Sequence, residues 1–485
     1  MVSNKSGKKT TIWWIRRDLR LEDNRALNAA LEEGDEVIPL FVIDPTLVNS
    51  ARMGDQRLGF LWDGLRNLQD ALRERGADLV VKRGDPLQVL PAVVKKSGAV
   101  RVHAEKDYTP YARRRDGKVK EQVPLVLNSG LTIAHPDDIR TNDGGPYQVY
   151  SYYMRKWKDR FLDGGMGNTL PAPARIPYHA ALNGESIPEH PRLPERVPFS
   201  AGEIEAQKRL KSFAAGEDPP VYDYDTLRDR PDLDGTSKLS PYLHLGMISA
   251  RQVVSAAERA LQRAPDKDSA RSAETWLEEL IWRDFYIAIL YHFPSVLERN
   301  FRDAYDPLVW RSDEDAFARW KEGKTGYPMV DAGMRQLLDT GWMHNRVRMV
   351  AASFLVKDLL IDWRWGETWF MKRLVDTDLA ANNGGWQWVA GTGTDASPYF
   401  RIFNPISQSE KHDPEGAYIR RYLPELAGVP GAFIHQPWKM PLEVQRESGC
   451  IIGEDYPQPL VDHSQARERT LKAYQEAREK SEGET

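Results

Sequence analysis

The sequence is short of cysteine and of long apolar runs. Its 485 residues include one cysteine, Cys450, which excludes an intramolecular disulfide and a multi-cysteine zinc site. No second His and no Cys stands at metal-ligand spacing from His344, so we expect no bound metal ion. No apolar run approaches the roughly 20 residues that a helix needs to cross a bilayer, and residues 11–15 are too short for a signal-peptide core. We therefore expect a soluble, cytoplasmic protein.

An excess of positive charge and a glycine-rich phosphate turn are missing as well. Lys and Arg total 67 against 71 Asp and Glu, so nucleic acid would have to be bound by a folded patch rather than by the overall field. After the first apolar run, Arg16-Arg-Asp-Leu-Arg20 stands where a G-x-G-x-x-G turn would follow. This excludes an ordinary NAD-binding domain.

Strand-like and helix-like segments alternate in residues 1–140. The strand-like runs are rich in β-branched and aromatic residues and lie at 11–15, 37–43, 79–82, 100–104 and 131–134. One of the helix-like stretches begins at Gly84-Asp-Pro86, where Asp suits the N-cap and Pro the first turn. The alternation predicts an α/β domain with a parallel sheet.

The rest of the chain divides into a connection and a helical region. Residues 162–231 are rich in proline and weakly periodic, which is typical of a long surface connection. Beyond Ser249 the apolar residues recur at helical spacing and no strand alternation is left. We predict an α/β domain at 1–140, an interdomain connection at 141–235 and a helical domain at 236–485.

Tryptophan is frequent, with 15 Trp beside 19 Tyr and 14 Phe, and residues 276–286 combine it with charge. One face of a helix there would carry Trp276, Glu279, Trp282, Arg283 and Tyr286. Because buried charges need partners, this mixture is unusual for a plain core. A half-buried helix with an ion pair between Glu279 and Arg283 is the simpler interpretation.

Residues 341–349 form a second polar motif. Asn345 and Met349 are four residues apart and share a helical face, whereas Arg346 and Arg348 point elsewhere, where they could meet phosphates. We interpret His344 as a hydrogen-bonded structural histidine rather than a metal ligand.

Residues 376–388 form a third motif, with two acids, two asparagines, two glycines and two tryptophans. In a helix, Trp386 and Trp388 are about 200° apart, so their indoles project to opposite sides. The acids do not follow the spacing of a calcium loop. A capped helix start with a solvated acid is a reasonable interpretation of Asp376 but not of the whole run.

A fourth segment, Gly235–Gly246, places a Thr/Ser-rich turn before a helix. Its hydroxyls and backbone N–H groups could bind an anion such as phosphate. Taken alone, an ordinary helix cap is the simpler interpretation.

Together these segments resemble the photolyase/cryptochrome family, and most closely its class I cyclobutane pyrimidine dimer photolyases. The four motifs occur in the order of the family, and the resemblance extends from Trp14–Asn24 through Glu322–Pro328 to Tyr399–Pro405. It implies a parallel-sheet, Rossmann-like photolyase domain followed by an all-α FAD-binding domain. The implied reaction is blue-light repair of UV-damaged DNA by a carbon–carbon lyase: excited FADH⁻ passes an electron to a flipped-out dimer, whose cyclobutane ring then opens.

The resemblance also assigns site residues. FAD would be bound by Tyr224, Thr236, Ser237, Lys238, Leu239, Ser240, Trp276, Arg283, Asn345, Asp376, Asp378 and Asn382, the last of which would face flavin N5. Glu279 would hydrogen-bond the dimer, with Asn345 and Met349 lining its pocket and Trp282 and Trp388 as aromatic walls. Electrons would reach oxidised FAD through Trp310, Trp363 and Trp386, and DNA would be contacted by Arg228, Glu279, Trp282, Arg346, Arg401 and Gln408.

Two other functions of the same family are weighed against this one. Plant-type cryptochrome photoreceptors tend to carry Asp where this chain has Asn382. Photolyases for pyrimidine–pyrimidone lesions usually carry His at the positions of Asn345 and Met349. Asn345, Met349 and Asn382 therefore favour repair of cyclobutane dimers.

A second, light-harvesting chromophore is common in the N-terminal domain of the family. Phe41–Pro45 and Asp107 favour a deazaflavin or a flavin, whereas His244 stands where deazaflavin binders typically carry Lys. Folate, deazaflavin and flavin all stay open. We further expect a monomer.

Overall fold

The computed structural model describes residues 8–162, 167–180, 182–191, 193, 196–395 and 402–483. The chain forms two units, and neither is continuous in sequence. The first unit consists of residues 1–193, 199–222 and 237–294, and the second of residues 194–198, 223–236 and 295–485.

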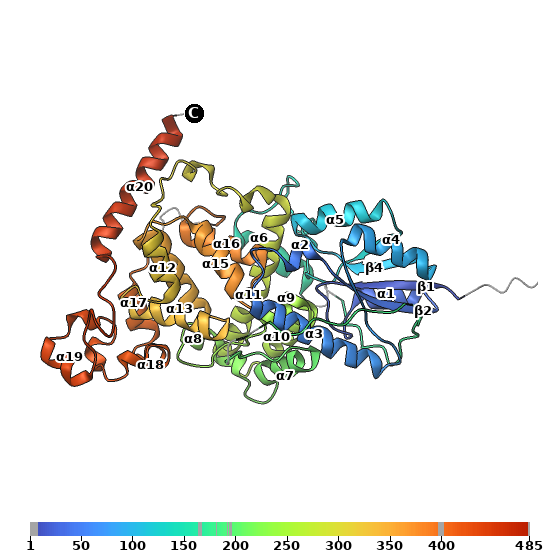
Figure 1. Ribbon diagram of the computed structural model, residues 1–485, viewed down its shortest axis with the longest axis horizontal. Helices are drawn as coiled ribbons and strands as arrows, with labels where there is room; N and C mark the ends of the chain where they lie inside the picture. The colour runs from blue at the N-terminus through green and yellow to red at the C-terminus, as the bar shows by residue number, and fades with distance from the viewer. Residues whose placement is uncertain are drawn as a thin grey trace, which may run out of the picture. The chain divides into compact units, whose positions relative to one another are not determined.

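The first unit contains a five-stranded parallel sheet (Figure 1). Its strands are β1 (Thr10–Ile15), β2 (Glu36–Ile43), β3 (Val80–Arg83), β4 (Arg101–Glu105) and β5 (Leu125–Asn128). The order is β3-β2-β1-β4-β5, so the chain moves outward from β1 in one direction and then in the other. All six residues of β1 are buried, as expected for a central parallel strand that is covered on both faces. The predicted α/β architecture is confirmed.

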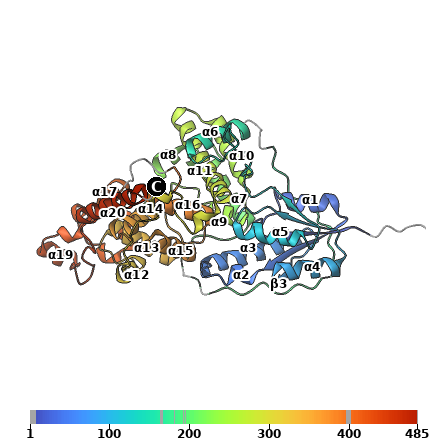
Figure 2. The same ribbon diagram turned by 90° about the horizontal axis from the view of Figure 1, so that it is seen from above.

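The helices of the first unit connect the strands and then form a helical layer of their own. They are α1 (Arg25–Glu33), α2 (Pro45–Val48), α3 (Asp55–Arg73), α4 (Pro86–Ser97), α5 (Pro110–Lys120), α6 (Tyr150–Phe161), α7 (Glu203–Ala214), α9 (Ser240–Leu245), α10 (Ala250–Arg263) and α11 (Lys267–His292). As predicted, α4 starts with Asp85 as its N-cap, whose side chain accepts from the N–H of Leu87. Helix α11 packs against both α6 and α10 (Figure 2).

The fifth strand is not at the predicted residues 131–134. The N–H groups of Ile133 and Ala134 donate to Oδ2 of Asp284, at 3.1 and 3.0 Å, instead of pairing with a strand. Asp284 belongs to α11, and its side chain is buried. Burial raises the pKa of Asp284 above its ordinary value, although Arg283 and these N–H groups act in the opposite direction.

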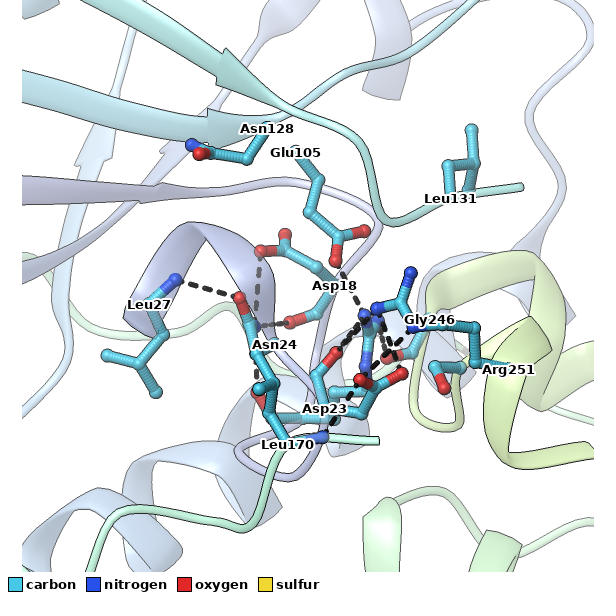
Figure 3. Close-up of polar contacts among 12 residues, drawn as sticks. Asp18, Asp23, Asn24, Leu27, Glu105, Asn128, Leu131, Leu170, Gly246 and Arg251 are labelled. Carbon is cyan, nitrogen blue, oxygen red and sulfur yellow. Dashed lines mark hydrogen bonds and ion pairs between the residues drawn. The ribbon is translucent and has the colours of Figure 1, made fainter. Parts of the chain in front are cut away.

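A buried polar network occupies the end of β1 and β4, the point at which the strand order reverses (Figure 3). Arg20 donates to Glu105 at 2.5 Å, and also to the backbone oxygens of Asp23 and Gly246. Arg251 pairs with Asp23 at 2.9 Å. Ligands of open α/β sheets usually bind at this point, where a glycine-rich turn cradles their phosphates. Here charged side chains fill it, which explains why the glycine fingerprint is missing from the sequence.

The described part of the second unit is built from helices without a sheet (Figure 1). Its α-helices in the described residues are α8 (Tyr224–Leu227), α12 (Glu314–Glu322), α13 (Pro328–Thr340), α14 (Asn345–Ser353), α15 (Trp363–Arg373), α16 (Leu379–Ala390), α17 (Pro405–His412), α18 (Ala417–Tyr422), α19 (Leu442–Ser448) and α20 (His463–Gly483). A π-helical turn, Phe354–Asp358, follows α14 directly. The core of this unit contains the buried indoles of Trp320, Trp363 and Trp386.

Candidate functional site

The predicted site residues fall in both units, and each group is described within its own unit. The first unit carries Ser237, Lys238, Leu239, Ser240, Trp276, Glu279, Trp282 and Arg283. The second carries Tyr224, Arg228, Thr236, Trp310, Asn345, Arg346, Met349, Trp363, Asp376, Asp378, Asn382, Trp386, Trp388 and Gln408. Arg401 lies outside the described residues.

Helix α11 presents its predicted residues in different environments. Trp276 is buried and packs against Phe213, with ring centroids 5.1 Å apart. Glu279 and Trp282 are half-buried. The Nη1 atom of Arg283 donates to the backbone oxygen of Leu131 at 2.9 Å. Arg283 is thus fixed to the segment that follows β5, and the contact of Glu279 and Trp282 with a ligand stays a prediction.

The hydroxyl turn before α9 is not an ordinary helix cap. Leu239 occupies the N-cap position and has no side-chain oxygen with which to cap. Lys238 has a φ of 49°, in the left-handed region that a residue with a Cβ seldom adopts. The simpler interpretation given above is therefore wrong, and the backbone here is held in a strained form of the kind found at binding sites.

Helix α14 brings two predicted lesion contacts together. The amide of Asn345 lies 3.9 Å from Sδ of Met349, as expected for residues one turn apart. Asn345 is exposed and Met349 is half-buried. His344 is the N-cap, and its Nδ1 accepts from the N–H of Arg346 at 3.2 Å. The interpretation of His344 as a structural histidine agrees with this contact.

The two arginines of α14 both bind carboxylates. Arg346 forms a two-point ion pair with Asp229. Arg348 donates to both oxygens of Asp376, at 3.1 and 2.9 Å, and its Nε donates to the backbone oxygen of Met343. Arg348 is thus placed to orient Asp376, a role that the sequence did not indicate.

The two acids before α16 have different roles. Asp378 is the N-cap, and its carboxylate accepts from the N–H groups of Ala380 and Ala381. Asp376 is buried and paired with Arg348. The interpretation of Asp376 as a solvated acid at a helix cap is therefore wrong. Asp376 is buried, and the N-cap is Asp378.

Asn382 lies in the first turn and a half of α16, and its side chain is fixed. Its amide nitrogen donates to the backbone oxygen of Glu367 at 3.0 Å. Asn383, the next residue, instead donates to the backbone oxygen of Val296 at 3.0 Å. The asparagine pair is thus divided, since one amide is directed to α15 and the other to the loop after α11.

The tryptophans of α16 differ in burial, and their projection to opposite sides stays a prediction. Trp386 is buried, with ring centroids 5.0 Å from Phe370 and 6.2 Å from Trp320. A Cβ atom at Gly366 would come within 2.1 Å of the Trp386 ring, so this close approach of α15 requires glycine. Trp388 is half-buried at the edge of the same core.

The other two indoles of the predicted electron relay differ in exposure. Trp363 is buried, and its Nε1 donates to Oδ1 of Asn300 at 3.0 Å. Trp310 is half-buried and meets Tyr474 of α20 edge-on, at 6.3 Å between ring centroids. One buried and one half-buried indole agree with an inner and an outer position. The order of the relay stays a prediction.

The remaining predicted DNA contacts lie near the start of the second unit and on α17. The guanidinium of Arg228 lies over the ring of Tyr224, 5.4 Å from its centroid. Gln408 belongs to α17 and is half-buried.

In the described residues, no three His, Cys, Asp or Glu side chains are grouped so as to hold a metal ion. No helix of this part of the chain is long and apolar enough to cross a bilayer.

Two family models match the chain. Residues 11–175 match the model of the DNA photolyase family, and residues 276–476 match the FAD binding domain of DNA photolyase. A deoxyribodipyrimidine photo-lyase of Halobacterium salinarum is 41% identical over 96% of this chain and 99% of its own.

Two solved structures are similar over nearly the whole chain. A class III photolyase from Agrobacterium tumefaciens superposes with a TM-score of 0.91 at 37% identity, over 99% of both chains. A cryptochrome from Synechocystis superposes with a TM-score of 0.89 at 31% identity, over 96% of this chain and 99% of that one.

Proposed function

The chain belongs to the photolyase/cryptochrome family, and on this premise we propose that it uses light to split cyclobutane pyrimidine dimers in DNA. The observation that carries this function is identity of about 40% to deoxyribodipyrimidine photo-lyases over nearly the full chain. The chain is therefore an enzyme, a carbon–carbon lyase, and its cofactor is FAD, bound through the helical family domain at 276–476.

The side chains around the start of α16 fit a flavin. Asp376 is held by Arg348, and Asn382 is held by the backbone of Glu367, so contacts within the protein fix a carboxylate and an amide. Fixed polar groups of this kind tune the electronics of a ring system without a reorganisation cost. When bound in its reduced form, FAD supplies the photoexcited electron that opens the cyclobutane ring. We assign the orientation of the flavin ring to Asp376, Asp378 and Asn382.

The protein must also replace the base stacking that the lesion loses when it leaves the duplex. Trp282 and Trp388 each expose part of an indole, on which an unstacked pyrimidine can stack. Glu279 and Asn345 supply hydrogen-bonding groups to the lesion, and Met349 adds an adaptable apolar contact. Arg228, Arg346 and Gln408 position the DNA backbone. The remaining assignments (Tyr224, Thr236, the turn at Ser237–Ser240, Trp276, Arg283 and Arg401) stay predictions from the resemblance.

The finer assignment to class I is part of the proposal. A class III photolyase is among the similar structures, so overall similarity does not separate the two classes, and the proposal of class I rests on the resemblance of the motifs alone. A sensory function is the second candidate, because a cryptochrome superposes almost as well. Asn382 favours repair, since plant-type receptors tend to carry Asp there. We also propose a cytoplasmic monomer; the identity of a second chromophore stays a prediction.

The experiment that tests this function uses two DNA oligonucleotides, one with a cyclobutane dimer and one with a pyrimidine–pyrimidone lesion. The reduced holoprotein is illuminated with blue light, with a dark sample as control, and products are separated by chromatography. We expect repair of the cyclobutane dimer in the light only. Repair of the other lesion alone would overturn the assignment of the substrate.

A further inference from the structure

Trp282 of α11 is stacked face to face on Tyr150, the first residue of α6. The ring centroids are 3.6 Å apart and the ring planes differ by 7°. Aromatic pairs prefer offset or edge-on arrangements with centroids about 4.5–7 Å apart, because their quadrupoles repel in a full sandwich. The arrangement is therefore imposed by the surroundings of the two rings rather than by their mutual attraction.

Tyr150 is held in place at both ends of its ring. Its hydroxyl donates to the backbone oxygen of Glu278 at 2.8 Å, and its side chain is 7% exposed. Phe285 meets it edge-on at 5.8 Å and meets Trp282 edge-on at 5.6 Å. Tyr286 packs against Trp282 from α11 itself, at 5.4 Å. Trp282 is therefore packed against aromatic rings of both α6 and α11.

A ring that is fixed in this way binds a planar partner better than a mobile one. A half-buried tryptophan on a helix can occupy several rotamers, and binding would have to select one of them. The stack on Tyr150 restricts the rotamers open to Trp282, which is half-buried. Less freedom is therefore lost when a base stacks on the indole.

We propose that Tyr150 is a positioning residue that holds the plane of Trp282 so that the opposite face of the indole receives the unstacked dimer. The inference rests on the proposed role of Trp282 as an aromatic wall for the lesion. Tyr150 does not touch the lesion in this account, and it acts only through Trp282. Its contribution comes from the ring and not from the hydroxyl alone.

The test compares Tyr150→Leu, Tyr150→Phe, Trp282→Ala and the double variant Y150L/W282A as holoproteins. Binding is measured in the dark, with an oligonucleotide that carries one cyclobutane dimer and with the same oligonucleotide undamaged. We expect Y150L to weaken binding of the damaged strand about 5- to 10-fold, in the range of a lost base–aromatic stack, with no change for the undamaged strand or in flavin content. Y150F should bind the damaged strand as the unchanged protein does. The double variant should bind it no more weakly than W282A alone.

Each of the following results would contradict a different part of the proposal. Normal dimer binding by Y150L, together with weak binding by W282A, would overturn the inference about Tyr150 and leave the role of Trp282 intact. Normal dimer binding by W282A would overturn the proposed lesion contact itself. Loss of flavin, or equal weakening for both oligonucleotides, in Y150L would assign Tyr150 to the support of the fold and overturn the inference as well.

Discussion

Arg346 donates from Nε and Nη2 to the two carboxylate oxygens of Asp229, at 3.1 and 2.6 Å. A residue proposed to contact DNA phosphate is therefore already paired within the protein. Burial favours the neutral form of Asp229, but the hydrogen bond and the charge of Arg346 outweigh it and hold the pKa of Asp229 below its ordinary value. The pair fixes the direction of the guanidinium, and the carboxylate of Asp229 offsets its positive charge.

Replacing Arg346 by alanine tests its contact with phosphate. We expect Arg346→Ala to weaken binding of damaged and undamaged DNA alike, about fivefold at low salt, and to reduce the slope of log K against log salt by about 1. Asp229→Asn should have the opposite effect on affinity, because it removes a negative charge near the phosphates. Arg478→Ala is the matched control, since Arg478 is an exposed arginine paired with Glu482 on α20. An unchanged salt slope in Arg346→Ala would remove Arg346 from the interface.

His412 of α17 gives a pH dependence of stability. Burial, aided by the charge of Arg346, lowers the pKa of His412 to about 4 from its ordinary 6.5. Between pH 6.5 and 4 the unfolded chain therefore binds more protons than the folded one, and the free energy of unfolding falls as the pH falls through this window.

Urea unfolding at pH 7 and pH 5, followed by circular dichroism, measures this effect. We expect the midpoint to fall on acidification, and to fall less in His412→Gln. His190→Gln serves as control, because His190 is an exposed histidine on the surface of the first unit. Equal acid sensitivity of the original chain and His412→Gln would contradict the assignment.

Replacing Glu279 separates repair from cofactor binding. We expect Glu279→Ala to lower the repair quantum yield about tenfold, which corresponds to one lost hydrogen bond to a charged group, while flavin stays bound. Glu278→Ala is the matched control, since the neighbouring Glu278 is paired with Lys158 at 2.8 Å. Loss of flavin from Glu279→Ala would show that this carboxylate supports the cofactor and not the lesion.

Trp310 should be needed for photoreduction but not for repair. We expect Trp310→Phe to slow the light-driven reduction of oxidised flavin, because phenylalanine is much harder to oxidise than tryptophan, and to leave repair by chemically reduced enzyme unchanged. Flavin absorption during illumination with an external reductant measures the first, and the repair assay the second. Trp438→Phe is the control, since its indole is half-buried against Tyr327. A normal photoreduction rate in Trp310→Phe would exclude Trp310 from the relay.

The sheet was largely predictable, because buried parallel strands are continuous β-branched runs bounded by turns. Four strands agree with their runs to within one residue. The exception is the run at 131–134, which looks like a strand but in which the N–H groups of Ile133 and Ala134 donate to Asp284, 151 and 150 residues later in the sequence. The π-helical turn at Phe354–Asp358 was equally hidden, since one extra residue in a turn leaves the apolar spacing almost unchanged.

At the candidate site the sequence identified residue types better than their partners. The opposite projection of Trp386 and Trp388 follows from helical geometry alone. The pairing of Arg348 with Asp376 does not, because it joins a helix to a loop 28 residues away. The stack of Tyr150 on Trp282 joins α6 to α11, and no local pattern connects them. Contacts of this kind depend on how helices pack, which spacing within one segment does not encode.

The central claim is that the reduced protein repairs a dimer that it already holds. The direct measurement is a single-turnover experiment, in which the fully reduced holoprotein is bound to an oligonucleotide with one cyclobutane dimer and receives a series of short blue flashes. The account predicts that intact pyrimidines appear in proportion to the photons absorbed, until every bound dimer is repaired, and that none appear in the dark. Tight binding of the dimer without any repair in the light would contradict it and would favour a sensory function.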